Sequence, residues 1–235
     1  VWNVVAAERF SVAPVQWCFP FAGCVSYRGY FDRGDAEKFV ERLAAQGYDT
    51  YSGGSGAYST LGYFNDPVVN TMLGGDTASL AGMLFHELAH QKLYVKDDSE
   101  LSEAFATAVE EYGVEAWLTE HGDSTALERY RMRIQRRAEF AALIAAQQAR
   151  LGVIYAAPTD DSTKLEAKAQ AFATLQSEYL AFEERWGGTT EYDGWLEGPL
   201  NNATLAAIAT YRRWLPALRW RLQTAGVTQF YAETA

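Results

Sequence analysis

The stretch Leu84-Phe85-His86-Glu87-Leu88-Ala89-His90-Gln91 carries the pattern H-E-x-x-H. Histidines four positions apart project from the same side of an α-helix, so the ring nitrogens of His86 and His90 converge on one point. A Zn²⁺ ion fits that point, and Glu87 flanks it, where a base acting on metal-activated water must lie. Two of the three histidines in the chain lie in this pattern. The alternative is a pair of histidines on a partly buried helix face.

A third ligand is expected, because catalytic zinc sites usually combine three protein side chains with one water. After His90 the sequence predicts a polar turn over residues 94–99 and a second helix over residues 100–111. If the short turn makes the two helices antiparallel, a carboxylate in the first turn of the second helix can face the histidines. Glu103 is the candidate, and Glu100 and Glu110 are its rivals. A solvent-exposed position is the ordinary alternative for each of them.

Several motifs carry a resemblance to a known family. Residues 101–106 resemble the N-E-x-F-A block that holds the glutamate ligand in gluzincin peptidases of the aminopeptidase N type, with Ser102 in place of Asn. The chain is more closely similar to the bacterial "predicted aminopeptidase" family of the same clan. It has that family's segments W-C-F-P at 17–20, G-C-V-x-Y-R-G-Y-F at 23–31, A-Y-S-T-L-G-x-F at 57–64, F-H-E-L-A-H-Q at 85–91 and E-x-F-A-T at 103–107.

The resemblance implies both a site and a chemistry. It makes His86, His90 and Glu103 the ligands of one zinc ion per chain, and Glu87 the catalytic base. It also implies a peptide substrate and aminopeptidase activity. The alternatives are an endopeptidase with the same site, and a non-catalytic peptide-binding or envelope scaffold protein that zinc stabilises.

The length and the apolar pattern of the chain predict an α+β fold that is mostly α. At 235 residues, 49% of them hydrophobic, the chain can bury one substantial core. We expect a zincin-like region over residues 1–122, with a small N-terminal sheet and two ligand helices. A helical lobe over residues 123–235 packs on it, or the two form one continuous domain. Helices are predicted over residues 35–46, 78–93, 124–151, 162–186 and 202–224, and a strand over residues 48–51.

A second strand is expected to bind the substrate. Thermolysin-like and aminopeptidase N-like enzymes have an edge strand ahead of the zinc helix, and its backbone pairs with the bound peptide. Ala57, Tyr58 and Ser59 occupy the corresponding position here. The aminopeptidase N signature has a glutamate on this strand that holds the amino group of the substrate, but residues 57–61 contain no acid. The candidates for that charge are Glu37, Glu41, Asp66 and Glu110, and the sequence does not choose among them.

The C-terminal part supplies two more candidates. Residues 201–211 resemble an Asn-Asn-Ala…Tyr block of the same family, so Asn202 is a candidate for substrate binding. Peptide hydrolysis also needs a donor that stabilises the oxyanion, and Tyr211 is the candidate for this catalytic role. Tyr155 and Tyr192 are its alternatives, and packing is the ordinary role of each tyrosine.

Other polar residues on the predicted helices have supporting roles. Thr107 and Glu110 lie one and two turns beyond Glu103, where they can orient a histidine by accepting its ring N–H, although both can equally be surface residues. His121 precedes Gly122 near a helix end and is expected to be a helix cap and not a ligand. Five arginines between positions 129 and 137 predict a salt-bridged, exposed helix face.

The two cysteines bear on the location of the protein. A turn can bring Cys18 and Cys24 within disulfide distance, and in an exported protein we expect a bridge between them; the alternative is a reduced, buried pair. Members of the family that the chain resembles usually carry an N-terminal export signal, often lipoprotein-like. The expected location is therefore the bacterial periplasm or cell envelope. Membrane association is expected only through an N-terminal anchor outside this chain, because no apolar run is long enough to cross a bilayer.

The charge of the chain excludes one class of partner. A formal net charge of −10 argues against nucleic acid, whose phosphates need a basic surface. An acidic surface is compatible with cationic peptides or free amino termini as ligands, but most acidic proteins are merely soluble. The oligomeric state is left open by the sequence.

Overall fold

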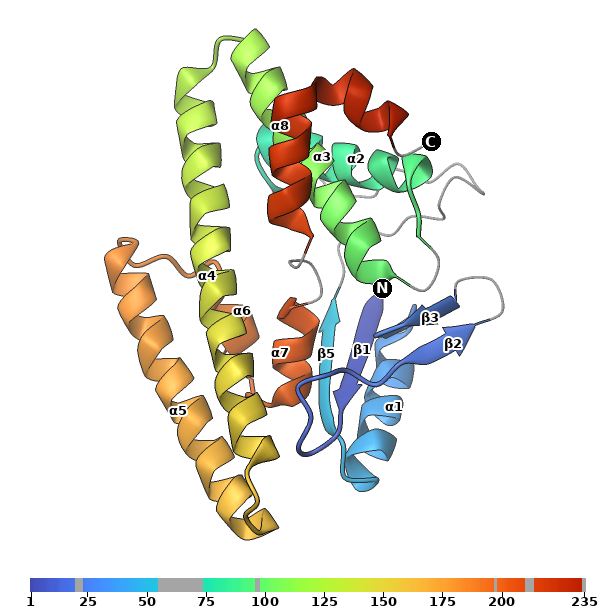
Figure 1. Cartoon of the computed structure of the whole chain (residues 1–235), viewed down its shortest axis with the longest axis vertical. Helices are drawn as coiled ribbons and strands as arrows, with labels where there is room; N and C mark the ends of the chain where they lie inside the picture. Colours follow the sequence, from blue (N-terminus) through green and yellow to red (C-terminus); the bar gives the residue numbers. More distant parts are fainter. Residues whose placement is uncertain (20–22, 55–73, 96–97, 197, 210–213, 234–235) are drawn as a thin grey trace.

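The computed structural model describes residues 1–19, 23–54, 74–95, 98–196, 198–209 and 214–233 (Figure 1). It is mostly helical, with a small antiparallel sheet near the N-terminus, which confirms the predicted α+β fold. The elements are β1 (Trp2–Ala7), β2 (Trp17–Phe19), β3 (Gly23–Val25), β4 (Arg28–Tyr30), α1 (Arg33–Ala45), β5 (Asp49–Gly54), α2 (Thr77–Lys92), α3 (Ser99–Glu120), α4 (Ser124–Ala156), α5 (Asp161–Arg185), α6 (Asp193–Leu196), α7 (Asn202–Ala209) and α8 (Leu215–Ala232).

The three-stranded sheet has β1 in its centre, in the order β4-β1-β5, with both pairs antiparallel. Successive side chains of a strand point to opposite faces. Val4 and Ala6 accordingly pack on α1, while Val5 and Ala7 pack on Ala203 and its neighbours in α7. Because both faces of β1 are covered, its four last residues are all buried. The sheet is thus held between α1 and the helical part of the chain.

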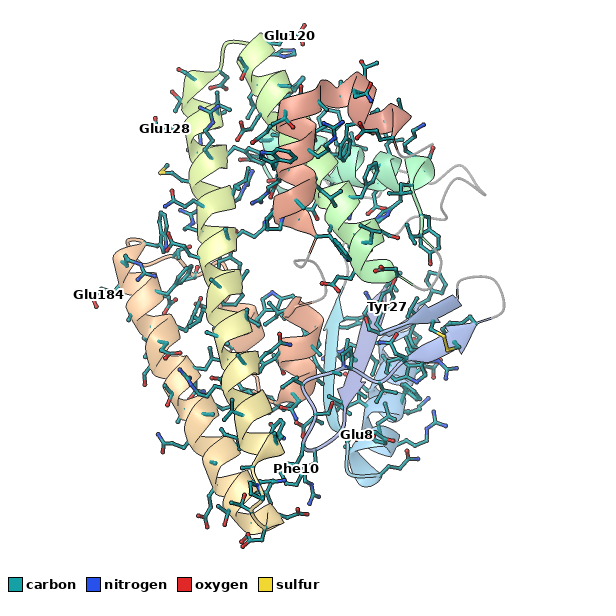
Figure 2. The ribbon with its side chains drawn as sticks, in the orientation of Figure 1. Glu8, Phe10, Tyr27, Glu120, Glu128 and Glu184 are labelled. Atoms are coloured by element: carbon teal, nitrogen blue, oxygen red, sulfur yellow. A yellow bond between two sulfur atoms is a disulfide. The ribbon has the colours of Figure 1, made fainter. Side chains whose placement is uncertain are left out.

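A disulfide joins the two strands of a hairpin beside this sheet. Strands β2 and β3 pair antiparallel, with Cys18 opposite Cys24 in the register, and the two sulfur atoms are bonded (Figure 2). The expected bridge is therefore confirmed. No free cysteine remains, since the chain has only these two.

The ends of the helices follow from capping residues. Helix α1 begins two residues earlier than predicted, because the side chain of Asp32 accepts a hydrogen bond from the backbone of Asp35. It ends before Gly47, whose φ of 90° lies in the left-handed region that favours glycine. Helix α4 runs five residues further than predicted, through Gly152 and up to Ala156 just ahead of Pro158.

Helix α4 connects the two ends of the molecule. It lies along α5, and it also contacts α3 near one end and α7 near the other (Figure 1). The largest core cluster lies at the α5 side, where Phe140 of α4 packs on Phe182 of α5 and stacks on Tyr192 at a ring distance of 4.0 Å. Within the described residues, we find no helix both long enough and apolar enough to cross a membrane.

The single helix predicted over residues 202–224 is wrong. The structure has two helices there, α7 and α8, and α8 begins at Leu215 with Pro216 in its first turn. Proline lacks a backbone N–H and fits the first turn of a helix but not its interior, so it marks a start. Gly226 then interrupts α8 with a φ of 75°, which turns the last part of the chain.

Candidate metal centre

Helices α2 and α3 are antiparallel neighbours, and both begin at an aspartate cap. Asp76 accepts a hydrogen bond from the backbone of Ser79, and Asp98 accepts one from the backbone of Leu101. These caps fix the starts of the two helices. The H-E-x-x-H turn of α2 lies opposite the first turns of α3. The pair packs closely, since a Cβ atom at Gly113 of α3 would lie only 2.8 Å from the ring of Phe85 in α2.

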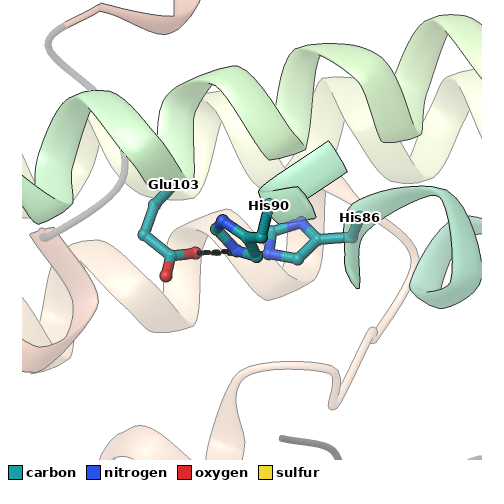
Figure 3. Close-up of side chains that lie close together, drawn as sticks. All are labelled: His86, His90 and Glu103. Carbon is teal, nitrogen blue, oxygen red and sulfur yellow. Dashed lines mark hydrogen bonds and ion pairs between the residues drawn. The ribbon is translucent and has the colours of Figure 1, made fainter. Parts of the chain in front are cut away.

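Three side chains converge between these helices (Figure 3). His86 Nε2 lies 3.2 Å and His90 Nε2 lies 3.6 Å from the same oxygen, Oε2 of Glu103. The three candidate ligand atoms all lie within 4.8 Å of one another. Of the rival glutamates, neither Glu100 nor Glu110 belongs to this group in the described part of the chain.

The spacing and the donor types fit a metal ion. Around a tetrahedral zinc ion with bonds of about 2.0–2.2 Å, neighbouring ligand atoms lie about 3.3–3.6 Å apart. The two distances from Glu103 Oε2 to the ring nitrogens of His86 and His90, 3.2 and 3.6 Å, are close to that range. Two imidazole nitrogens and one carboxylate oxygen are a donor set that suits zinc. The group could therefore hold such an ion with little movement.

The second ring nitrogen of His86 is also held. His86 Nδ1–H donates to Oε2 of Glu110 over 3.3 Å, and the other oxygen of Glu110 accepts from Arg137 Nη1 over 3.3 Å. The sequence left Thr107 and Glu110 as equal candidates for this contact. The structure brings Glu110 to the ring, while Thr107 is buried one turn away along α3. The Nδ1 atom of His90 is buried and has no hydrogen-bond partner among the described residues.

The charges of this group depend on one another. Burial alone would lower the pKa of His86, but its hydrogen bonds to Glu103 and Glu110 and the charges of both carboxylates raise it to about 10. Burial alone would raise the pKa of Glu103, but its contacts with His86 and His90 lower it to about 2. In the absence of a metal, a positive imidazolium therefore lies between negative carboxylates. A divalent cation would take the place of that positive charge.

Glu87 and Tyr27 complete the surroundings of the site. Glu87 follows His86 on α2 and is half-buried. Tyr27 lies where the sheet approaches the first turn of α3 (Figure 2). Burial raises the pKa of Tyr27, and the charges of Glu103 and Glu87 are among the interactions that raise it further. The phenol therefore keeps its proton and can act as a hydrogen-bond donor. Sequence reasoning missed this residue, although it lies in the Y-R-G-Y-F motif.

Asn202 has a different environment from the one expected. It is fully buried at the start of α7, its Nδ2 donates to the backbone oxygens of Glu8 and Arg9, and its Oδ1 accepts from Tyr155. The side chain thus joins the helical part of the chain to the loop after β1. This geometry favours a structural role over the predicted contact with substrate.

The remaining candidates fall into three groups. Tyr155 donates a hydrogen bond to Asn202, and Tyr192 is buried in the aromatic cluster around Phe140. His121 caps α3 as expected, with Nδ1–H donating to the backbone oxygen of Trp117 over 2.8 Å. Five predicted site residues lie outside the described part of the chain: Ala57, Tyr58, Ser59, Asp66 and Tyr211.

Comparison with known proteins adds one match. A family model described as "Putative aminopeptidase" matches residues 1–235, the whole chain. No curated protein and no solved structure matches it. The family description agrees with the resemblance that the sequence motifs carry. The chain therefore belongs to the family described as "Putative aminopeptidase".

Proposed function

We propose that the protein is a zinc-dependent aminopeptidase of the gluzincin type, with His86, His90 and Glu103 as the metal ligands. The observation that carries the proposal is the convergence of two imidazole nitrogens and one carboxylate oxygen from neighbouring helices. Glu87 is the next residue after His86 on α2. Three protein ligands leave one coordination position open, as a catalytic zinc site requires. The family description supports a peptide as the substrate.

Each residue of the site has a role in this proposal. Zinc, when bound, polarises the scissile carbonyl and lowers the pKa of water. Glu87 is the base that accepts a proton and later delivers it to the leaving amine. Tyr27 is the proposed donor to the oxyanion, because its protonated phenol lies near Glu103 and Glu87. Tyr211 remains a second candidate for this role, and Ala57, Tyr58 and Ser59 remain the proposed substrate strand.

A peptide library tests the activity. Wild-type protein should contain about one zinc per chain and release amino acids from peptides with free amino termini. It should not cleave the same peptides once they are N-acetylated. Cleavage of the acetylated peptides would instead indicate an endopeptidase.

The variant Glu87→Gln separates catalysis from metal binding. It should keep its zinc but lose about 10²–10⁴-fold in turnover, the usual contribution of a positioned acid–base group. Glu100→Gln is the matched control, because Glu100 lies in the first turn of α3 but outside the metal group. The control should keep both zinc and activity. Zinc binding without turnover of any peptide by the wild type would support a non-catalytic scaffold.

The proposed location is the bacterial periplasm or cell envelope. The bridge between Cys18 and Cys24 is compatible with it, since disulfides persist in oxidising compartments outside the cytosol. Alkylation of fractionated cells tests the point. Protein from the envelope fraction should react with a thiol reagent only after reduction, whereas free thiols in a cytosolic fraction would contradict the proposal.

A further inference from the structure

We propose that Arg137 of α4 is a positioning residue for the metal centre, acting through Glu110 on His86. The inference rests on the proposed function in one respect, namely that His86 is a zinc ligand. It goes beyond that function because it makes a residue of the long connecting helix a part of the metal site. The sequence predicted the arginines of this segment to form an exposed, salt-bridged face.

The first step is the bridging position of Glu110. One of its oxygens accepts the Nδ1–H of His86, and the other accepts Nη1–H of Arg137, each over 3.3 Å. The side chain of Glu110 is only 14% exposed, so water has little access to replace either contact. A carboxylate with one fixed partner on each oxygen has little freedom to rotate. The plane of the His86 ring is therefore set partly by a cation that lies on another helix.

The second step is the way in which Arg137 itself is held. Its Nη1 also lies 3.9 Å from Glu111, the next residue along α3. Glu111 is buried, and both of its oxygens accept N–H groups from Arg219 of α8. Positive and negative side chains thus alternate in the order Arg219, Glu111, Arg137 and Glu110. Through Glu110, which contacts His86, this row of charges connects α8, α3 and α4 to the metal-binding helix α2.

The third step is the space on the side of α2. Gly82 faces Glu110 there, and a Cβ atom at this position would lie 3.3 Å from Cγ and 3.4 Å from Oε1 of Glu110. The glycine therefore leaves room for the carboxylate between the two helices. Arg137 on one side and the backbone of α2 on the other confine the same side chain, so loss of Arg137 frees Glu110 on one side only.

These contacts predict an effect on metal affinity. Metal-bound histidines need a fixed acceptor for their second ring N–H, and loss of such an acceptor typically weakens metal binding about 10–100-fold. If Arg137 holds Glu110 in place, removal of the guanidinium should cause much of that loss although Arg137 touches no ligand atom. A purely structural role of Arg137 would change stability but not the environment of a bound metal.

The experiment measures zinc affinity by competition with a chelator, and the visible spectrum of the Co²⁺-substituted protein. Arg137→Gln should bind zinc about tenfold more weakly or worse and should show a shifted Co²⁺ spectrum, and Arg137→Lys should recover part of the affinity. The control is Arg136→Gln, since Arg136 is a neighbour of similar exposure that pairs with Glu191. The control should match the wild type within about twofold. Wild-type affinity in folded Arg137→Gln, or an equal loss in the control, would overturn the proposal.

A double variant allows the role of Arg137 to be tested even if Arg137→Gln alone does not fold. Glu110→Gln with Arg137→Gln removes both charges of the pair, so no buried carboxylate is left without its partner. If Arg137 acts through Glu110, the double variant should bind zinc as Glu110→Gln alone does. A further loss of affinity in the double variant would refute that route.

The outcome also separates this inference from the proposed function. Zinc bound by the wild type, with no effect of Arg137, overturns the inference alone. Failure of the wild type to bind zinc at all overturns both. Tight zinc binding that depends on Arg137, without peptidase activity, supports the inference and contradicts the proposed function.

Discussion

The substitution Gly113→Ala tests whether α2 and α3 lie as close together as the proposed metal site requires. Alanine is favoured over glycine in a helix interior by about 1 kcal/mol. The new Cβ atom would, however, lie 2.8 Å from Cδ2 and 3.0 Å from Cγ of Phe85. Carbon atoms in good contact are about 3.5–4.0 Å apart, and such overpacking costs about 1–3 kcal/mol. The net change in unfolding free energy is therefore a destabilisation of about 0–2 kcal/mol.

Gly152→Ala is the matched control for this effect. Gly152 also lies inside a helix, α4, but a Cβ atom there would have nothing within 4 Å. It should therefore stabilise the protein by about 1 kcal/mol. The effect of the substitution on the unfolded chain is the same in both variants and cancels when they are compared. The difference between the two free energies isolates the contact between α2 and α3.

Urea denaturation of the metal-free protein measures this difference, which should be about 1–3 kcal/mol. Zinc affinity should fall in Gly113→Ala, because separation of the helices moves the two histidines of α2 away from Glu103 of α3. It should be unchanged in Gly152→Ala. Equal stabilisation by both substitutions would mean that the helices are further apart than described, and the geometric case for the metal site would then be lost.

Three further predictions concern the disulfide, the pH dependence and the oxyanion donor. Replacing Cys18 and Cys24 by serine should lower the unfolding free energy by about 2 kcal/mol, the loop-entropy value for so short a loop; no change in urea denaturation would contradict it. The pKa of His86 is raised from 6.5 to about 10 without metal, so its contribution to stability is complete below pH 6.5 and is lost as the pH rises toward 10. To bind His86, zinc must displace that proton, so the apparent zinc affinity should increase with pH over this range. A zinc affinity that does not change with pH, measured by chelator competition, would refute the pairing of His86 with the two carboxylates. Tyr27→Phe should keep its zinc and lose about 10²-fold in turnover, the usual effect of one oxyanion donor; unchanged turnover would leave the role to another residue.

Much of the fold could be predicted because helix signals are local. The aspartate caps at positions 76 and 98 and the glycine at position 47 mark helix ends close to those observed. The errors in the helix ends came from Gly152 and Pro216, because the effect of a glycine or a proline on a helix depends on its position in that helix. The helix predicted over residues 124–151 ends before Gly152, but a glycine inside a helix costs only about 1 kcal/mol, and α4 continues to Ala156, just ahead of Pro158. Pro216 lies within an apolar pattern that looked continuous, yet it starts a new helix.

The core of the site could be predicted from spacing, but its surroundings could not. His86 and His90 are fixed on one helix face by the helical period, and Glu103 follows from a short antiparallel turn. Tyr27 comes from the connection between β3 and β4 and Arg137 from the connecting helix, and both reach the site only through the tertiary fold. A side chain such as Asn202 has the chemistry of a substrate ligand, and only its burial and hydrogen bonds indicate a structural role.

Anomalous diffraction at the zinc absorption edge, from crystals grown with Zn²⁺, tests the metal centre most directly. One strong peak per chain is predicted between α2 and α3, at about 2.0–2.2 Å from Nε2 of His86, Nε2 of His90 and a carboxylate oxygen of Glu103. A peak elsewhere, or one that Glu103 does not contact, would contradict the proposed ligand set.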